Sequence, residues 1–107
     1  MTEDHVKILV VEDEETHAEL IRRSFAKASN RYELLVTPSL KAARAIMEVF
    51  KPDLIISDLL LPDGKGTDLI EPEPQRPFIV MTSFGDEHAA VEAIKAGALD
   101  YVVKSVS

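Results

Sequence analysis

Five side chains that could act together in phosphoryl chemistry each follow a short apolar run of the 107-residue sequence: Glu12, Asp13, Asp58, Thr82 and Lys104. A set of carboxylates without Cys or His favours a hard divalent cation with oxygen ligands, such as Mg²⁺. Asp58 could attack phosphorus as a carboxylate nucleophile and form an acyl phosphate. The cation and Lys104 would neutralise charge on the transferring group, and the Thr82 hydroxyl would donate a hydrogen bond to it.

The three carboxylates need positive charge nearby because like charges repel. At a separation of about 4 Å and an effective dielectric near 20, each like-charged pair costs on the order of 4 kcal/mol. Lys104 supplies one positive charge, and a divalent cation is the natural second. Phosphoryl oxygens would fill the coordination positions that the protein leaves open.

Five apolar runs rich in β-branched residues predict the strands that position these groups. The runs cover residues 7–11, 32–36, 54–57, 78–82 and 100–104. Strands that alternate with helices predict an α/β fold, with a parallel sheet and helices on both faces. Groups that follow the carboxyl ends of such strands meet at one edge. All strands except the second therefore deliver a charged or reactive group to that edge.

Apolar residues at helical spacing predict the intervening helices. The first covers about residues 18–28, and the second extends from an N-cap at Ser39 to Pro52. The second helix has a buried face of residues three or four apart: Leu40, Ala43, Ile46 or Met47, and Phe50.

The third helix is predicted to be short. Residues 59–66 contain two glycines and are expected to form a loop, and a helix starting near Thr67 should last one or two turns. Three prolines lie just beyond its start: Pro72, Pro74 and Pro77. The fourth helix is expected to begin at an Asp86 cap, to continue through Ala96 and to have Gly97 at its C′ position.

Composition limits the kind of protein. A chain of this length fits one domain, and its net charge of −7 argues against a nucleic-acid-binding surface. The sequence contains no cysteine, and its first apolar run is too short for a signal sequence or a membrane span. We therefore expect a cytoplasmic protein that binds neither nucleic acid through this domain nor a membrane.

These residues resemble the receiver domain of response regulators over essentially the whole chain. The shared features are Glu12-Asp13, Asp58, Pro62, Gly64, Thr82, the run 96–101 and Lys104. The resemblance implies a flavodoxin-like, doubly wound sheet of five parallel strands in the order 2-1-3-4-5. It also implies that Asp58 accepts a phosphoryl group from the phosphohistidine of a histidine kinase or a phosphotransfer domain.

The resemblance further assigns roles around Asp58. Asp13, Asp58 and the backbone carbonyl of Leu60 would bind Mg²⁺, with Glu12 acting through water. Thr82 and Lys104 would hold the phosphoryl oxygens.

The family's conformational switch is implied at two positions. Thr82 would move toward the phosphoryl group, and Tyr101 would rotate inward behind it. The apolar side chains of Leu60 and Phe84, two residues after Asp58 and Thr82, predict slow self-dephosphorylation.

The sequence departs from the family pattern in four places. Ser105 replaces the usual proline after the pocket lysine, and Ser83 replaces the usual Ala or Gly. The third helix is truncated and the fifth is missing, which would leave one apolar face partly bare and prone to association, for example as a homodimer. We therefore expect residues 1–107 to be a C-terminally incomplete receiver domain, N-terminal in a larger sensor histidine kinase or hybrid protein.

Other functions fit less well. A receiver that is not phosphorylated would serve as a docking or dimerisation module, and the intact pocket argues against it. An aspartyl phosphatase would need an acid where Leu60 stands, so we expect no enzymatic turnover beyond assistance to the domain's own phosphorylation. A flavodoxin-type cofactor site is disfavoured because the acidic run 12–15 would repel a phosphate. Separately, Asp58 could be a loop cap, and Tyr101 an ordinary strand tyrosine.

Overall fold

Five parallel strands form one sheet in the order β2-β1-β3-β6-β7 in the computed structural model, which describes residues 5–28, 30–72, 76–83 and 85–104. The strands are β1 (Val6–Val11), β2 (Tyr32–Thr37), β3 (Leu54–Asp58), β6 (Phe78–Thr82) and β7 (Asp100–Val103). The predicted parallel sheet and its order are confirmed. Each predicted strand differs from the observed one by at most one residue at either end.

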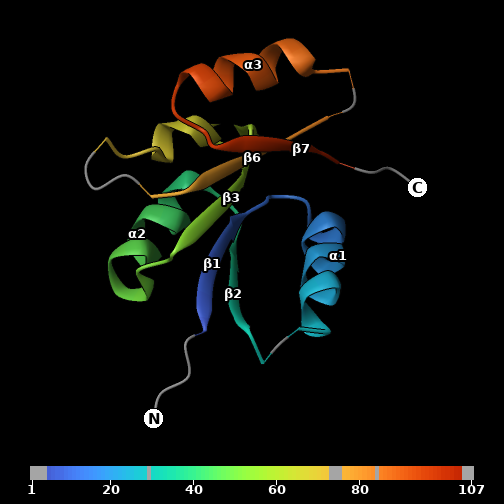
Figure 1. The fold of residues 1–107 in the computed structure, drawn as a ribbon, viewed down its shortest axis with the longest axis vertical. Helices are drawn as coiled ribbons and strands as arrows, with labels where there is room; N and C mark the ends of the chain where they lie inside the picture. The colour runs from blue at the N-terminus through green and yellow to red at the C-terminus, as the bar shows by residue number, and fades with distance from the viewer. Residues whose placement is uncertain (1–4, 29, 73–75, 84, 105–107) are drawn as a thin grey trace.

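Helices cover both faces of this sheet, as predicted. They are α1 (Glu15–Ala26), α2 (Leu40–Phe50) and α3 (Glu87–Lys95), together with the 3₁₀ turn η1 (Gly66–Leu69). Figure 1 shows α1 and α2 on opposite sides of β1. The predicted third helix corresponds to η1. It is short, as expected from the prolines that follow it.

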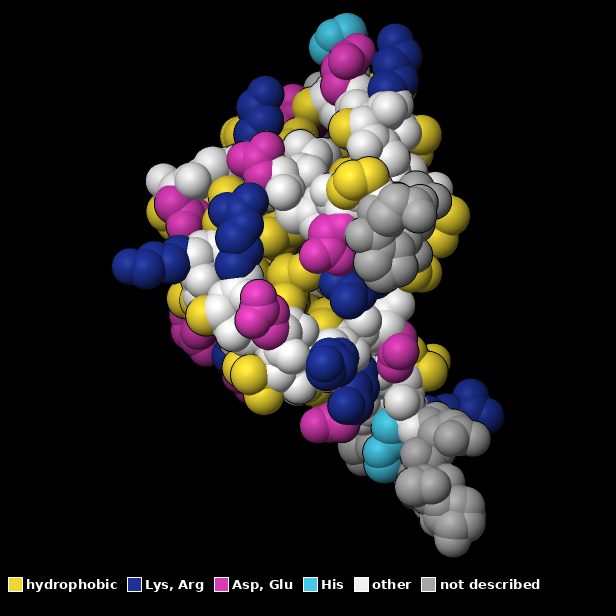
Figure 2. Space-filling model, turned by 90° about the vertical axis from the view of Figure 1, so that its left-hand side faces the viewer, with side chains coloured by type: hydrophobic (Ala, Val, Ile, Leu, Met, Phe, Trp, Pro, Cys, Tyr) yellow, Lys and Arg dark blue, Asp and Glu magenta, His cyan; other side chains and the backbone are white. Residues whose placement is uncertain are grey.

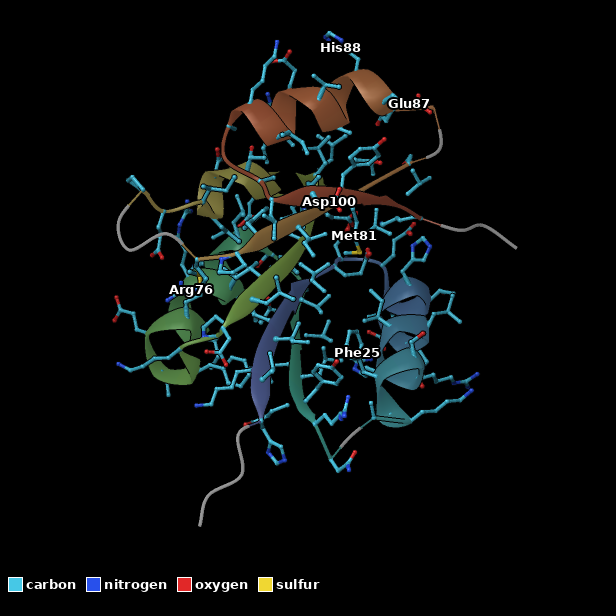
Figure 3. All side chains as sticks on the ribbon, viewed as in Figure 1. Phe25, Arg76, Met81, Glu87, His88 and Asp100 are labelled. Atoms are coloured by element: carbon cyan, nitrogen blue, oxygen red, sulfur yellow. The ribbon has the colours of Figure 1, made fainter. Side chains whose placement is uncertain are left out.

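Alternation along the central strands divides the core in two. Leu9 and Val11 point to the side of α2, η1 and α3, where they pack with Ile55, Phe78 and other buried residues. The intervening Ile8 and Val10 point to the side of α1, together with Met81 and Phe25. Figure 3 labels Phe25 on α1 and Met81 on β6, which belong to this second cluster. Burial on both faces explains the nearly continuous apolar sequence of β1.

The start and end of α2 follow from local chemistry. The Ser39 hydroxyl accepts a hydrogen bond from the Ala42 N–H at 3.1 Å, so the predicted N-cap is confirmed. The helix ends at Lys51, which has a positive φ of 52° and precedes Pro52. Both ends of α2 are therefore fixed by residues adjacent to it in the sequence.

Two local predictions were confirmed only in part. Asp86 occupies the N-cap position of α3, but its side chain makes no capping hydrogen bond. The segment after Asp58 is more regular than the predicted loop, because β4 (Leu60–Leu61) and β5 (Gly64–Lys65) form a small antiparallel hairpin. At the other end of α3, Gly97 takes a φ of 121° at the C′ position, as expected.

Strand β7 forms one edge of the sheet, and each of its residues is exposed. Val102 is 52% exposed although its register partner Met81 is only 7% exposed. In the described part of the chain no helix follows β7. The sheet is therefore least covered at this edge, where a fifth helix was expected to be missing.

Charges of both signs share the surface on the α2 side. Figure 2 shows lysine, arginine and acidic side chains interspersed over this face, with apolar side chains between them. On this face the charges form no continuous basic surface of the kind that neutralises nucleic-acid phosphates.

Candidate functional site

A cavity of about 220 Å³ lies at the carboxyl ends of the strands. Five of the predicted site residues line it: Asp13, Asp58, Leu60, Thr82 and Lys104. They come from the ends of β1, β3, β6 and β7 and from β4. The parallel topology thus brings together groups that are up to 91 positions apart in the sequence, because each strand ends at the same edge.

Asp58 and Lys104 form an ion pair inside this cavity. The Lys104 Nζ atom lies 2.7 Å from Asp58 Oδ1 and donates a hydrogen bond to Oδ2 at 2.9 Å. The Lys104 N–H also donates to the Thr82 carbonyl at 2.8 Å. This backbone bond continues the β6–β7 pairing by one residue and so sets where the lysine side chain leaves the sheet.

Glu12 lies beneath the pair and is 2% exposed. Its Oε2 atom accepts a hydrogen bond from the Glu14 N–H at 3.0 Å. Its Oε1 atom lies 3.0 Å from Lys104 Nζ, but it has no partner in hydrogen-bonding geometry within the described residues. The single Lys104 ammonium thus faces two buried carboxylates, those of Glu12 and Asp58, so the site can accept a further positive charge.

The pKa values of the three charged groups reflect their proximity. Burial raises the pKa of Asp58 from 3.8 to about 7; the Lys104 hydrogen bond opposes this increase, and the Glu12 carboxylate adds to it. Burial also acts to raise the pKa of Glu12, but contacts with Asp58, the Glu14 N–H and Lys104 lower it overall. Burial acts to lower the pKa of Lys104, and its two acidic partners raise it overall. A proton and a cation therefore compete for Asp58.

The residues present fit a divalent cation. Carboxylate oxygens of Glu12, Asp13 and Asp58 lie within 4.8 Å of one another. Glu12 and Asp58 are buried and Asp13 is exposed, so one side of the group faces solvent. Because the two buried carboxylates share the Lys104 ammonium, this all-oxygen set is suited to a hard cation such as Mg²⁺.

The backbone beside Asp58 is packed tightly against η1. The Ser57 hydroxyl donates a hydrogen bond to the Asp58 carbonyl at 2.9 Å, and Ser57 is fully buried. A Cβ atom at Gly66 would lie 2.1 Å from the same carbonyl oxygen, so only glycine fits there. The Gly66 N–H donates to the Leu59 carbonyl at 2.8 Å. These contacts fix the chain as it leaves β3.

The two predicted switch residues lie differently with respect to the cavity. Thr82 is 2% exposed and lines it. Tyr101 lies on β7 beside Val80 and is 37% exposed. It is not among the residues that line the cavity. Phe84 and Ser105, which also entered the prediction, lie outside the described residues.

Sequence reasoning missed several residues at the site. Asp86 lines the cavity, although its position before α3 favoured a capping role. Glu14, Leu59 and Met81 line it as well, and so does Ser83, which had been noted only as a departure from the family pattern. Only their position beside Asp13, Asp58 and Thr82 could have indicated the first three. Ser57 and Gly66 had no such signal, because their contacts depend on the close approach of η1 to β3.

Comparisons with known proteins agree on one family. A family model described as the response regulator receiver domain matches residues 8–107. The methanogenesis regulatory protein FilR1 from Methanothrix harundinacea is 43% identical over an alignment of 104 positions, which covers 91% of this chain and 23% of that protein. The chain therefore spans about a quarter of the length of this curated relative.

Solved structures show the same fold. The BeF₃-activated N-terminal receiver domain of RstA from Klebsiella pneumoniae superposes with a TM-score of 0.83 at 28% identity, covering 94% of this chain and 87% of that chain. The phosphorylated cyanobacterial phytochrome response regulator RcpA superposes with a TM-score of 0.84 at 25% identity, covering 96% and 83%. None of the described helices is long and apolar enough to cross a membrane.

Proposed function

The chain belongs to the response regulator receiver domain family, and we propose that it accepts a phosphoryl group on Asp58 from a histidine kinase or a phosphotransfer domain. The main support is the position of Asp58. Its carboxylate is buried at the end of β3, contacts the Lys104 ammonium at 2.7 Å and lines a cavity that opens to solvent. A nucleophile held against a cationic group in a cavity suits phosphoryl transfer.

In the transfer step, a deprotonated Asp58 oxygen forms a bond to phosphorus while the P–N bond of the phosphohistidine breaks. The bonding electron pair goes to the imidazole nitrogen of the donor, and Asp58 becomes an acyl phosphate. The Lys104 ammonium contacts both Asp58 oxygens, so it is placed to neutralise charge on the phosphoryl oxygens. The Thr82 hydroxyl would donate to another of these oxygens.

The cation of this site would be Mg²⁺. Asp13, Asp58 and the Leu60 carbonyl would hold it directly, and Glu12 would act through water. When bound, Mg²⁺ supplies charge neutralisation to the transferring phosphoryl group. Glu12 is 2% exposed, so its carboxylate would be held beside the ion and not displaced toward bulk solvent.

Phosphorylation would change the conformation through Thr82 and Tyr101. Thr82 lines the cavity, so its hydroxyl can follow a new oxygen at Asp58. Its movement would free space on the same face of the sheet, where Val80 and Tyr101 are register partners. Tyr101 is 37% exposed and would turn into that space. The charge change at Asp58 would thereby bias a two-state element.

A docking or dimerisation module without phosphorylation is the second candidate function. The observation in its favour is the exposed edge of the sheet, where Val102 is 52% and Leu99 67% exposed. Under either function we propose a cytoplasmic protein that turns over no separate substrate.

Incubation with acetyl phosphate and Mg²⁺, followed by intact-mass measurement, tests the proposal. We expect one added phosphoryl group in the wild-type chain and none in Asp58→Asn. Treatment with EDTA should abolish the adduct. If the wild-type chain gains no phosphoryl group under conditions that phosphorylate a known receiver, the second candidate function is favoured.

A further inference from the structure

The turn after Asp58 is attached to the N-terminus of α2 by one side chain. Pro62 and Asp63 form the two-residue connection between β4 and β5. Asp63 Oδ1 accepts a hydrogen bond from the Leu40 N–H at 2.9 Å, and Oδ2 accepts one from the Lys41 N–H at 3.0 Å. These two bonds lower the pKa of Asp63, so the carboxylate is charged at neutral pH. Its charge also suits the positive end of the helix.

This contact links two distant segments and does more than cap a helix. The first N–H groups of α2 have no partner within the helix, and Ser39 already satisfies that of Ala42. Asp63 accepts hydrogen bonds from the two N–H groups that precede that of Ala42, those of Leu40 and Lys41, although it is 23 and 22 positions away from them. The hairpin and α2 also meet where Leu40 packs beside Gly64, since a Cβ atom there would lie 2.7 Å from Leu40 Cδ1. The hairpin is thus held against a rigid helix.

The same hairpin contains Leu60, whose backbone carbonyl is a proposed ligand of Mg²⁺. The Leu60 side chain is 65% exposed, so its packing does little to fix the carbonyl. Among the described strands, β4 pairs only with the two-residue β5. An isolated two-stranded hairpin of this size has little stability of its own. The base of the hairpin is held by the Leu59 and Gly66 backbone bonds and by Leu61, which packs against the core. Its turn, two residues beyond Leu60, is held by Asp63. The position of the Leu60 carbonyl therefore depends on both ends of the hairpin.

We propose that Asp63 is a positioning residue that sets the cation affinity of the site by anchoring the Leu60 hairpin to α2. The inference rests on the proposed function, because it concerns the same cation. Asp63 touches neither the cation nor the phosphoryl group. Its loss should weaken cation binding while the charged groups of the cavity remain in place. The maximal rate of phosphoryl transfer, reached at saturating cation, should change much less.

The experiment compares Asp63→Ala with the matched control Ser39→Ala. Both variants remove a hydrogen-bond acceptor from the N-terminus of α2, but only the first frees the hairpin. Affinity is measured with Mn²⁺ by electron paramagnetic resonance, and phosphorylation by acetyl phosphate is followed over a range of Mg²⁺ concentrations. Circular dichroism establishes that each variant is folded, and Asp63→Asn, which keeps one acceptor oxygen, provides an intermediate case.

We expect Asp63→Ala to bind Mn²⁺ about tenfold more weakly than the wild type, as is typical when a supporting contact of a metal ligand is lost. Its half-saturating Mg²⁺ concentration should rise in parallel, and Asp63→Asn should lie between the two. Ser39→Ala should match the wild type. Equal affinities in Asp63→Ala and Ser39→Ala would overturn the inference while wild-type phosphorylation still supports the proposed function. A wild-type chain that binds no Mn²⁺ would overturn both.

Discussion

The Lys104 ammonium lies within 3.0 Å of both Asp58 oxygens, although the two residues are 46 positions apart. Glu12 Oε1 lies 3.0 Å from the same ammonium. One lysine therefore serves two buried carboxylates. This leaves one negative charge without compensation until a cation binds. This uncompensated charge determines how the site responds to cations, to pH and to the loss of Lys104.

Removal of the lysine should slow phosphorylation. In Lys104→Ala the phosphoryl oxygens lose their cationic partner from the protein, and the rate with acetyl phosphate should fall by about 100-fold, as when one stabilising donor is removed from an active site. Lys95→Ala is the matched control, because Lys95 is exposed and forms an ion pair with Glu92 at 3.7 Å, away from the cavity. A similar loss of rate in both variants would show that total charge matters and the cavity lysine does not.

Neutralisation of Asp58 should stabilise the cation-free chain at high pH. The pKa of Asp58 is raised to about 7 in the folded state, so the folded chain holds this proton more tightly than the unfolded chain between pH 4 and 7. Stability from this group is present at low pH and lost as the pH rises through about 7. In EDTA at pH 8, Asp58→Asn should exceed the wild type in unfolding free energy by on the order of 2 kcal/mol.

Urea unfolding from pH 4 to 8 measures this difference, which should shrink toward zero at the acidic end. Asp68→Asn, at an exposed aspartate, is the control and should show no such trend. Saturating Mg²⁺ should stabilise the wild type and reduce the advantage of Asp58→Asn. An advantage that grows as the pH falls would contradict the electrostatic account.

The buried Glu12 should contribute more to cation binding than an exposed acid on the same side of the molecule. We expect Glu12→Gln to weaken Mn²⁺ binding by about tenfold, because it removes a charge that supports the ion through water. Glu15→Gln should have little effect, since Glu15 is exposed and pairs with Arg22 at 2.9 Å. Isothermal titration of each variant measures the affinities, and equal affinities would exclude a role for Glu12.

The exposed Leu60 side chain should slow the loss of the phosphoryl group. Leu60 lines the cavity and offers no polar atom to hold an attacking water. Leu60→Asn keeps the backbone carbonyl and adds an amide, so self-dephosphorylation should become severalfold faster. Leu99→Asn is the control, because Leu99 is equally exposed, at 67%, on the way into β7. Decay of the phosphorylated mass with time gives both rates.

Much of the fold was predictable from sequence because its strands are buried on both faces. The runs that became β1, β3 and β6 are almost entirely apolar, and the alternation with helices left few arrangements. The meeting of Asp58 with Lys104 followed from the same topology, since each comes at the carboxyl end of a strand. The sequence alone therefore predicts that reactive groups gather at the carboxyl edge of the sheet.

Other features depend on contacts that sequence patterns do not encode. The hairpin of β4 and β5 has two residues per strand, too few for a period to be visible. Glu12 and Asp13 are neighbours in an acidic run, yet one is buried and the other exposed. The partners of Asp63 lie more than 20 positions away. Asp86 has a residue type that favours N-caps, but its side chain makes no capping hydrogen bond, and the residue lines the cavity.

The most direct test of Asp58 as the acceptor is to identify which residue carries the phosphoryl group. Borohydride reduces an aspartyl phosphate to homoserine, so peptide mass spectrometry after phosphorylation and reduction identifies the modified residue. We predict homoserine at position 58 and at no other aspartate, only in samples that received both Mg²⁺ and the phosphodonor. Homoserine at another position, or unmodified Asp58 in a chain that carries a phosphoryl group, would contradict the claim that Asp58 is the acceptor.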